Sequence, residues 1–227
     1  MLPPEMIAAR EAISGRYLFG QGIEIGALHM PLPTPLGASV TYVDHLDVAG
    51  LRKHYPELAD CELKCDRVDD GEKLTTFADD SLDFIIANHM LEHCENPIGA
   101  ARNHFQRLRS GGYLYYAIPA REHGFDGKRP LTTWDHLLQD DQLGAEASRA
   151  EHYLEYATLV DPMPSHEECV TYARHLMAHS YSIHFHVWDE ETFSTFLKKL
   201  QLHMSYSFTI ADFTASGSEV IAVLRKV

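Results

Sequence analysis

The chain has 227 residues, of which 45% are hydrophobic and 23% are charged, an ordinary composition for a globular protein. Nineteen basic and 33 acidic side chains give a net charge of −14, which disfavours binding to nucleic-acid phosphates or to an anionic membrane surface. At about 150 residues per domain, we predict one domain over residues 1–227 that includes an insertion. The unusual feature is the 15 histidines, which outnumber the 10 Phe and the 11 Tyr residues.

Cysteine usage and the start of the chain indicate a cytoplasmic protein. The four cysteines form no Cys-x-x-Cys pair and are too few to build a disulfide scaffold. Pro3, Pro4 and Glu5 stand where a signal peptide would need a basic start and an apolar stretch, and no run approaches about 18 apolar residues. We therefore expect free thiols and neither secretion by this route nor a membrane span.

The first half of the chain alternates between helical and extended patterns. The expected order is helix 5–18, strand 22–25, strand 40–43, helix 47–55, strand 61–65, strand 82–87, helix 97–109 and strand 113–118. Most of these strands are continuous apolar runs, which is typical of a parallel sheet covered on both faces. We predict an α/β fold with a doubly wound, mostly parallel, seven-stranded sheet.

The alternation stops after the fifth strand and resumes near residue 182. Residues 119–181 are expected to form a helical insertion, a lid over the sheet, with helices near 132–142 and 146–160. The patterns that follow predict strand 182–188, helix 189–200, strand 203–213 and strand 218–225. Because only a short turn joins the last two strands, they are predicted to pair antiparallel.

Polar residues follow the predicted strands where an open parallel sheet binds its ligand. Glu24, Asp44, Asp70 and Asn88 stand at or near these strand ends, and Asp44 has the spacing from Glu24 of a carboxylate that binds ribose hydroxyls. The first loop has only Gly26, so it lacks the glycines that cradle a pyrophosphate. This combination favours a nucleoside ligand without phosphates, such as S-adenosylmethionine.

Several motifs occur in the order of one known family. They are GIEIGA at 22–27, YVD at 42–44, DDGEKL at 69–74, SLDFIIANHMLEHCENP at 81–97 and RLRSGGYLYYAIP at 107–119. With the terminal strand pair, the chain resembles the class I S-adenosylmethionine-dependent methyltransferases, in the small-molecule group of the methyltransferase type 11 kind. The resemblance is strong over about 18–119 and weak over 182–227.

The resemblance implies a set of cofactor-binding residues. They are Glu24, Gly26, Ala27, Leu28, Asp44, His45, Asp70, Gly71 and Asn88. In the family, the first of these surround the methionine end, Asp44 would bind the ribose, Asp70 the adenine amino group, and Asn88 would line the sulfonium. The chain departs from the family by having Gly26 alone in the first loop, with a proline-rich segment after it.

Three of these acidic residues also have simpler local interpretations. Glu24 suits a buried acid with a nearby partner, and Asp44 suits a helix N-cap. Asp70 suits an Asp-Gly turn. The sequence leaves both interpretations of each residue open.

Methyl transfer to a hydroxyl needs an aligned nucleophile and a group that removes its proton. We expect a histidine near the ends of the fourth and fifth strands to do this, His89 first, then His93 or His123. The insertion is rich in Tyr, Arg and His, which suits a polar small-molecule acceptor. We expect O-methylation of a sugar or natural-product hydroxyl; N-methylation of a small molecule, a non-catalytic nucleoside-binding module and a homodimer stay open.

Two histidine patterns also match metal sites. His89, Glu92 and His93 form His-x-x-Glu-His, which in a helix would be a zinc pair with a carboxylate base, as in metal-dependent hydrolases. The position after a buried strand and the surrounding motifs favour the methyltransferase. A divalent metal at this trio, as in O-methyltransferases of similar design that use an acidic residue with a Glu-His pair, stays open but is not expected, and His93 also suits a structural hydrogen bond. His184 and His186, one face of a predicted strand, form a weaker pattern with Glu190.

Overall fold

The computed structural model describes residues 3–227 and contains a seven-stranded sheet in the order β3-β2-β1-β4-β5-β7-β6. The strands are β1 (Gly20–Ile25), β2 (Ala38–Asp44), β3 (Arg67–Val68), β4 (Leu82–Asn88), β5 (Leu108–Pro119), β6 (Phe208–Ser216) and β7 (Glu219–Lys226). Strands β1 to β5 are parallel, whereas β7 pairs antiparallel with both β5 and β6. The predicted α/β fold, with its mostly parallel sheet and terminal antiparallel pair, is confirmed.

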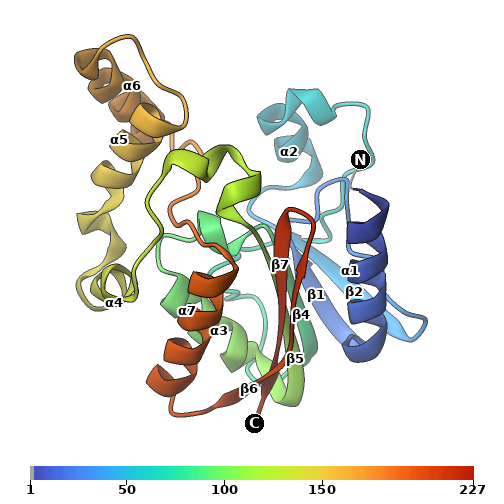
Figure 1. The fold of residues 1–227 in the computed structure, drawn as a ribbon. Helices are drawn as coiled ribbons and strands as arrows, with labels where there is room; N and C mark the ends of the chain where they lie inside the picture. Colours follow the sequence, from blue (N-terminus) through green and yellow to red (C-terminus); the bar gives the residue numbers. More distant parts are fainter. Residues whose placement is uncertain (1–2) are drawn as a thin grey trace.

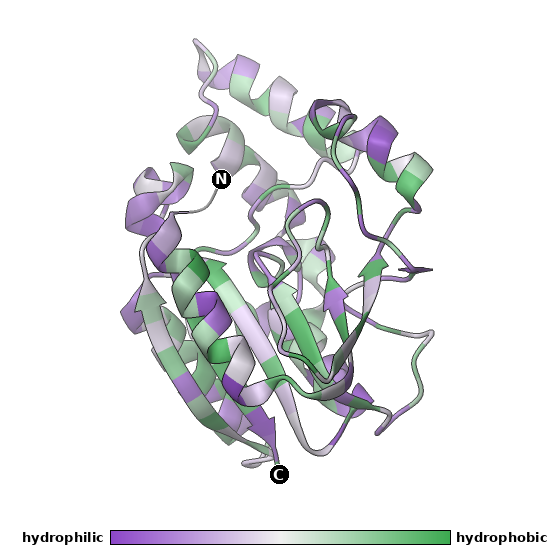
Figure 2. Ribbon diagram, turned by 90° about the vertical axis from the view of Figure 1, so that its right-hand side faces the viewer, coloured by the Kyte–Doolittle hydropathy of each residue, from purple (hydrophilic) through white to green (hydrophobic). Residues whose placement is uncertain are grey.

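Helices cover both faces of this sheet (Figure 1). They are α1 (Pro4–Tyr17), α2 (Val48–His54), α3 (Pro97–Arg107), α4 (Trp134–Leu143), α5 (Arg149–Leu159), α6 (His166–Ala178) and α7 (Glu190–His203). Alternate residues of β4 point to opposite faces: Phe84 and Ile86 pack in the core under α1, and Ile85 packs in the core under α3 and α7. Burial on both faces explains why these strands are continuous apolar runs, and Figure 2 shows the hydrophobic residues concentrated along the central strands.

The third strand lies at Arg67–Val68, so the prediction of a strand at 61–65 is wrong. Residues 61–65 read Cys-Glu-Leu-Lys-Cys, and they contact extended chain only through an isolated bridge between Leu28 and Lys64. The short β3 pairs with Val43 and Asp44 at the sheet edge. An edge strand of two residues gives no apolar run for a sequence pattern to detect.

The segment 182–188 forms an isolated bridge between Trp188 and Ala120 but is not a strand of the sheet, so that prediction is also wrong. The backbone N–H groups of Phe185 and His186 donate to the carbonyl of Glu92, and that of Val187 donates to the hydroxyl of Thr132. The place beside β5 is taken by β7 instead. Helix α7 continues to His203, so the sixth strand begins at Phe208 and not at 203.

The region between β5 and α7 is helical, as predicted for 119–181, and includes α6 as a third helix besides the two that were expected. Helices α5 and α6 pack against each other around a small core of their own, which includes Tyr153, Ala157, Cys169 and Leu176. Figure 1 shows them beyond the carboxyl edge of the parallel strands. Within residues 3–227, no helix is both long and apolar enough to cross a membrane.

Candidate active site at the carboxyl edge of the sheet

Strand pairing brings the ends of β1, β2 and β4 side by side, because β1 pairs in parallel with both neighbours. The side-chain N–H of Asn88 donates to Oε1 of Glu24 over 3.2 Å. Oδ1 of Asn88 is buried and accepts no hydrogen bond from residues 3–227. Gly26 has a φ of +67°, and no atom lies within 4 Å of the position a Cβ would take. The site therefore offers open space over the first turn and a buried acceptor beside it.

The proline-rich loop folds back over the end of β1 instead of turning into a helix. The N–H of Leu32 lies 2.9 and 3.1 Å from the two carboxylate oxygens of Glu24, and the hydroxyl of Ser14 donates to the carbonyl of Pro33 over 2.6 Å. Burial raises the pKa of Glu24 to about 7, although the hydrogen bonds from Leu32 and Asn88 and the charge of Arg10 lower it. Glu24 thus has the local partners that its simpler interpretation requires.

Asp44 ends β2 with a carboxylate that is only partly used. Its Oδ1 accepts from the backbone N–H of His45 over 2.8 Å and lies 2.7 Å from Nδ1 of the same residue. The N-cap of α2 is Asp47, which accepts from the N–H of Gly50, so the interpretation of Asp44 as a helix cap is wrong. Oδ2 of Asp44 makes no hydrogen bond within the described chain, which leaves it free to accept from a ligand hydroxyl.

The turn after β3 holds the next two predicted residues. Asp70 accepts from the N–H of Glu72 over 2.9 Å and from the ammonium of Lys73 over 2.6 Å, so it does form the local turn. A Cβ at Gly71 would lie 2.7 Å from Cγ2 of Ile25, which explains why glycine stands there. The adenine-binding role of both residues stays a prediction.

A buried histidine that the sequence did not single out fixes this turn. Nε2 of His104 lies 2.8 Å from the carbonyl of Gly71, and Nδ1 lies 2.9 Å from the hydroxyl of Tyr116. Burial lowers the pKa of His104 to about 4, so the ring is neutral and can donate to Gly71 while it accepts from Tyr116. The remaining first-loop residues use their backbone: the carbonyl of Ala27 accepts from Met30, and that of Leu28 accepts from Lys64.

His89 follows β4 in the left-handed region, with a φ of +48°, and faces two carboxylates. Its Nε2 lies 3.0 Å from Oε2 of Glu219, and its Nδ1 lies 3.6 Å from Oε1 of Glu92. Arg10 donates two hydrogen bonds to the same Glu219, at 2.9 and 2.5 Å. Burial lowers the pKa of His89, but the hydrogen bond to Glu219 and the charge of Glu92 outweigh it and raise the pKa above its usual value.

His93 has different surroundings. Its Nδ1 lies 2.9 Å from the carbonyl of Ile183, and within residues 3–227 its Nε2 makes no hydrogen bond. Burial, together with the nearby His184, lowers the pKa of His93, although the charge of Glu92 raises it. Both carboxylate oxygens of Glu92 are buried and accept no hydrogen bond from the described residues. A neutral imidazole with a free lone pair therefore lies beside a carboxylate that accepts no hydrogen bond from the described residues and lies 3.6 Å from Nδ1 of His89.

The alternative of a zinc pair at His89 and His93, which the sequence did not favour, lacks its geometry because residues 89–93 are not one helix. His89 has a positive φ and turns to Glu219, and the three residues after Met90 form a short 3₁₀ helix. Ligand atoms of Glu92 and His93 instead lie within 4.8 Å of one of His184. The weaker alternative of a site at His184, His186 and Glu190 also lacks its geometry, since the two histidines belong to different side-chain clusters.

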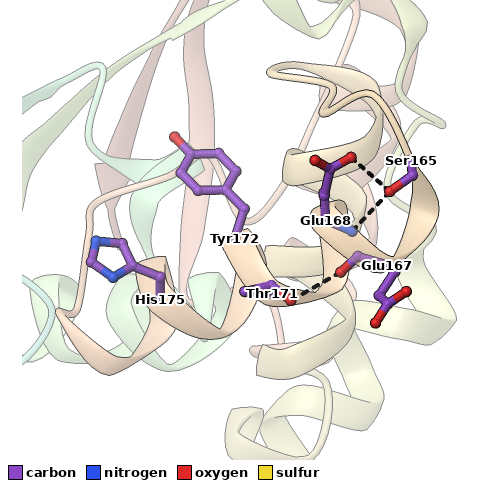
Figure 3. A pocket seen from close by; sticks show the side chains of 6 residues that line it. All are labelled: Ser165, Glu167, Glu168, Thr171, Tyr172 and His175. Atoms are coloured by element: carbon purple, nitrogen blue, oxygen red, sulfur yellow. Dashed lines mark hydrogen bonds between the residues drawn. The ribbon is translucent and has the colours of Figure 1, made fainter.

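His123 is exposed, and its side chain makes no hydrogen bond to the described chain, so nothing joins it to His89 and His93. A surface pocket of about 750 Å³ lies away from the strand ends, on α6 (Figure 3). Its hydrogen bonds are local to the helix: Ser165 caps Glu168, and Thr171 donates to the carbonyl of Glu167. We therefore place the candidate site at the carboxyl edge of the sheet.

Solved structures share this fold. A S-adenosylmethionine-dependent methyltransferase of Methanosarcina mazei is 14% identical, with a TM-score of 0.51 over 100% of this chain and 98% of the other. A candidate methyltransferase of Haloferax volcanii, in complex with the Trm112 activator, is 10% identical, with a TM-score of 0.52 over 97% and 88%. A candidate zinc-dependent alcohol dehydrogenase of Rhodobacter sphaeroides is 14% identical, with a TM-score of 0.52 over 93% and 86%. At these identities, the similarities establish the fold alone.

The fold and the polar strand ends define a Rossmann-like protein with a nucleoside site. A methyltransferase domain family matches residues 19–204, most of the chain, and the chain belongs to this family. It is therefore an S-adenosylmethionine-dependent methyltransferase. No curated protein matches the sequence.

Proposed function

We propose that the protein transfers a methyl group from S-adenosylmethionine to a hydroxyl of a small polar acceptor, a sugar or a natural product. The observation that carries this proposal is the neutral His93, with a free Nε2, beside the buried carboxylate of Glu92, which accepts no hydrogen bond from the described residues. Such a pair suits removal of a proton from a hydroxyl. The cytoplasmic location expected from the sequence stays a prediction.

The residues present fit the cofactor at four points. Oδ2 of Asp44 is free to accept a ribose hydroxyl, and the buried Oδ1 of Asn88 lacks a donor that a ligand would supply. The open space over Gly26 leaves room for the chain that joins ribose and sulfonium. When bound, the cofactor supplies an electrophilic methyl group. Glu24, with lone pairs left beside its bonds to Leu32, would face the positively charged amino group.

Three residues, His93, Glu92 and His89, account for proton removal and for the position of the acceptor. Nδ1 of His93 lies 2.9 Å from the carbonyl of Ile183 and 3.0 Å from the hydroxyl of Ser182. When the N–H at Nδ1 donates to that carbonyl, Nε2 is left to take the hydroxyl proton. The carboxylate of Glu92 stabilises the imidazolium that results. His89, whose two nitrogens face Glu219 and Glu92, is held toward its protonated form and positions the acceptor. We therefore place His93 before His89 as the base.

The test compares the wild type and two variants in methyl transfer from labelled S-adenosylmethionine to a panel of sugars, phenols and amines. His93→Gln should lower kcat by about 10²- to 10⁴-fold while the affinity for S-adenosylhomocysteine stays unchanged. His166→Gln, an exposed histidine on α6, should leave both unchanged and serves as the matched control. Full activity of the His93 variant would contradict the assigned base. Methyl transfer to the amines of the panel and to no hydroxyl would show that the protein is an N-methyltransferase and would contradict the proposed O-methylation.

A further inference from the structure

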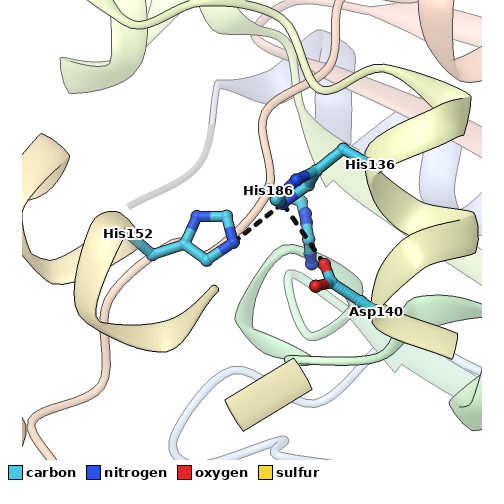
Figure 4. A group of neighbouring side chains, drawn as sticks. All are labelled: His136, Asp140, His152 and His186. Atoms are coloured by element: carbon cyan, nitrogen blue, oxygen red, sulfur yellow. Dashed lines mark hydrogen bonds and ion pairs between the residues drawn. The ribbon is translucent and has the colours of Figure 1, made fainter. Parts of the chain in front are cut away.

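Four side chains that the proposed reaction does not use converge between the insertion and the end of the sheet (Figure 4). His136 and Asp140 come from one face of α4, His152 comes from α5, and His186 comes from the segment before α7. One ligand atom of each lies within 4.8 Å of those of all the others. Asp140, His152 and His186 are buried, and His136 is partly exposed.

The polar atoms of this cluster are not satisfied by one another. Nδ1 of His186 and Oδ2 of Asp140 are buried and have no hydrogen-bond partner among residues 3–227. The Nε2 atoms of His136 and His152 face each other at 3.0 Å, and that of His136 lies 3.2 Å from Oδ2 of Asp140. Buried polar atoms without hydrogen-bond partners are costly, so these two atoms, in a cluster whose ligand atoms all lie within 4.8 Å of one another, favour a bound cation.

Neighbouring groups orient the cluster in the way that metal ligands are usually oriented. The hydroxyl of Ser148 donates to Oδ1 of Asp140 over 2.6 Å, which leaves Oδ2 turned to the cluster. Nε2 of His186 lies 3.3 Å from the carbonyl of Glu95, which leaves Nδ1 free. A ligating histidine commonly donates its other N–H to a backbone carbonyl, and a ligating carboxylate is commonly hydrogen-bonded as well.

We propose that His136, Asp140, His152 and His186 bind one zinc ion. Three imidazoles and one carboxylate bind zinc in preference to calcium or magnesium, which favour oxygen ligands. In a tetrahedral site with bonds of about 2.0–2.2 Å, neighbouring ligand atoms lie about 3.3–3.6 Å apart, close to the 3.0 and 3.2 Å that His136 makes here. Because the protein fills all four positions, the ion is structural and joins α4, α5 and the 182–188 segment.

The other group of metal-binding residue types, Glu92, His93 and His184, carries no such proposal. Nδ1 of His184 lies 2.6 Å from Asp126, and the cluster offers three ligands, not four. It belongs to the acceptor end of the candidate active site. A Glu92→Gln variant therefore separates the two clusters in a metal-binding measurement.

The experiment incubates the full-length protein with zinc, removes loose metal by gel filtration and measures bound zinc by mass spectrometry. We expect about one zinc ion per chain for the wild type and for Glu92→Gln, and close to none for His136→Gln and His152→Gln. The double variant His166→Gln, His175→Gln, which removes two histidines of α6 outside the cluster, should retain the zinc. Zinc should raise the Tm of the wild type and leave that of His136→Gln unchanged.

His136 is the partly exposed ligand, so its variant should fold, and circular dichroism checks this. Cobalt in place of zinc gives the wild type the visible bands of a tetrahedral site, and His136→Gln should lose them. Equal zinc in the wild type and in the cluster variants would overturn the proposal. Octahedral cobalt bands in the wild type would overturn it as well.

Discussion

The buried carboxylate of Glu24 makes a prediction in which stability and ligand binding move in opposite directions. Moving the pKa of a carboxyl from 4.5 to about 7 corresponds to about 3 kcal/mol of unfavourable free energy for the ionised form. The protonated Glu24 therefore contributes its full stabilisation of the folded chain below pH 4.5. This contribution is lost as the pH rises from 4.5 to about 7, and it does not change further above pH 7. Glu24→Gln removes this cost, and its amide oxygen still accepts from Leu32.

The assay is urea unfolding of the wild type and Glu24→Gln at pH 4.5 and pH 8. At pH 8, we expect the variant to be more stable by about 2–3 kcal/mol, and at pH 4.5, we expect the two to agree within about 1 kcal/mol. Effects of other titrating groups are common to both proteins and cancel in the difference. S-adenosylhomocysteine should bind the variant more weakly, because the amino group of the ligand loses Glu24 as an anionic partner.

Two outcomes would refute this reasoning. A variant that is less stable than the wild type at both pH values would mean that Glu24 is ionised and well compensated. An unchanged affinity of the variant for S-adenosylhomocysteine would mean that Glu24 does not contact the ligand. Glu167→Gln, on the exposed part of α6, is the matched control and should change neither quantity.

Further predictions concern two buried networks. Glu219→Gln leaves Arg10 buried without its partner and should lower the free energy of unfolding by about 3–5 kcal/mol, while NMR titration should show a lower pKa for His89; an unchanged His89 pKa would contradict the assigned contact. Because the pKa of His104 is lowered to about 4 in the folded chain, its neutral ring has no effect on the free energy of unfolding above pH 6.5. As the pH falls from 6.5 to about 4, that free energy decreases by about 3 kcal/mol. His104→Gln should weaken this acid dependence, and an identical pH profile would count against it.

The sheet could be predicted because its strands carry their own signal. Burial of β4 on both faces requires an apolar run, and the short turn between β6 and β7 leaves no choice but antiparallel pairing. The segments that failed lack such signals. Strand β3 has two exposed residues, and 182–188 is held by hydrogen bonds to Glu92 and Thr132 that no periodicity encodes.

Site residues that stand at the end of a strand could be predicted from the sequence. Site residues that depend on contacts between distant parts of the chain could not. Asn88 and Glu24 were both expected at the strand ends where the ligand binds, and the structure adds that they are hydrogen-bonded to each other. The pairing of Arg10 with Glu219 joins residues 209 positions apart, and neither stands in a motif. The zinc cluster draws on α4, α5 and a later segment; the spacing of His136 and Asp140 along one helix was its only local signal.

The central claim is that the carboxyl edge of the sheet binds S-adenosylmethionine, and titration calorimetry with S-adenosylhomocysteine tests it most directly. We predict that the wild type binds, and that Asp44→Asn binds about 10- to 100-fold more weakly because a charged acceptor of the ribose hydroxyls is lost. Asp47→Asn, which alters only the exposed cap of α2, should bind like the wild type. Equal affinity of Asp44→Asn and the wild type would contradict the account.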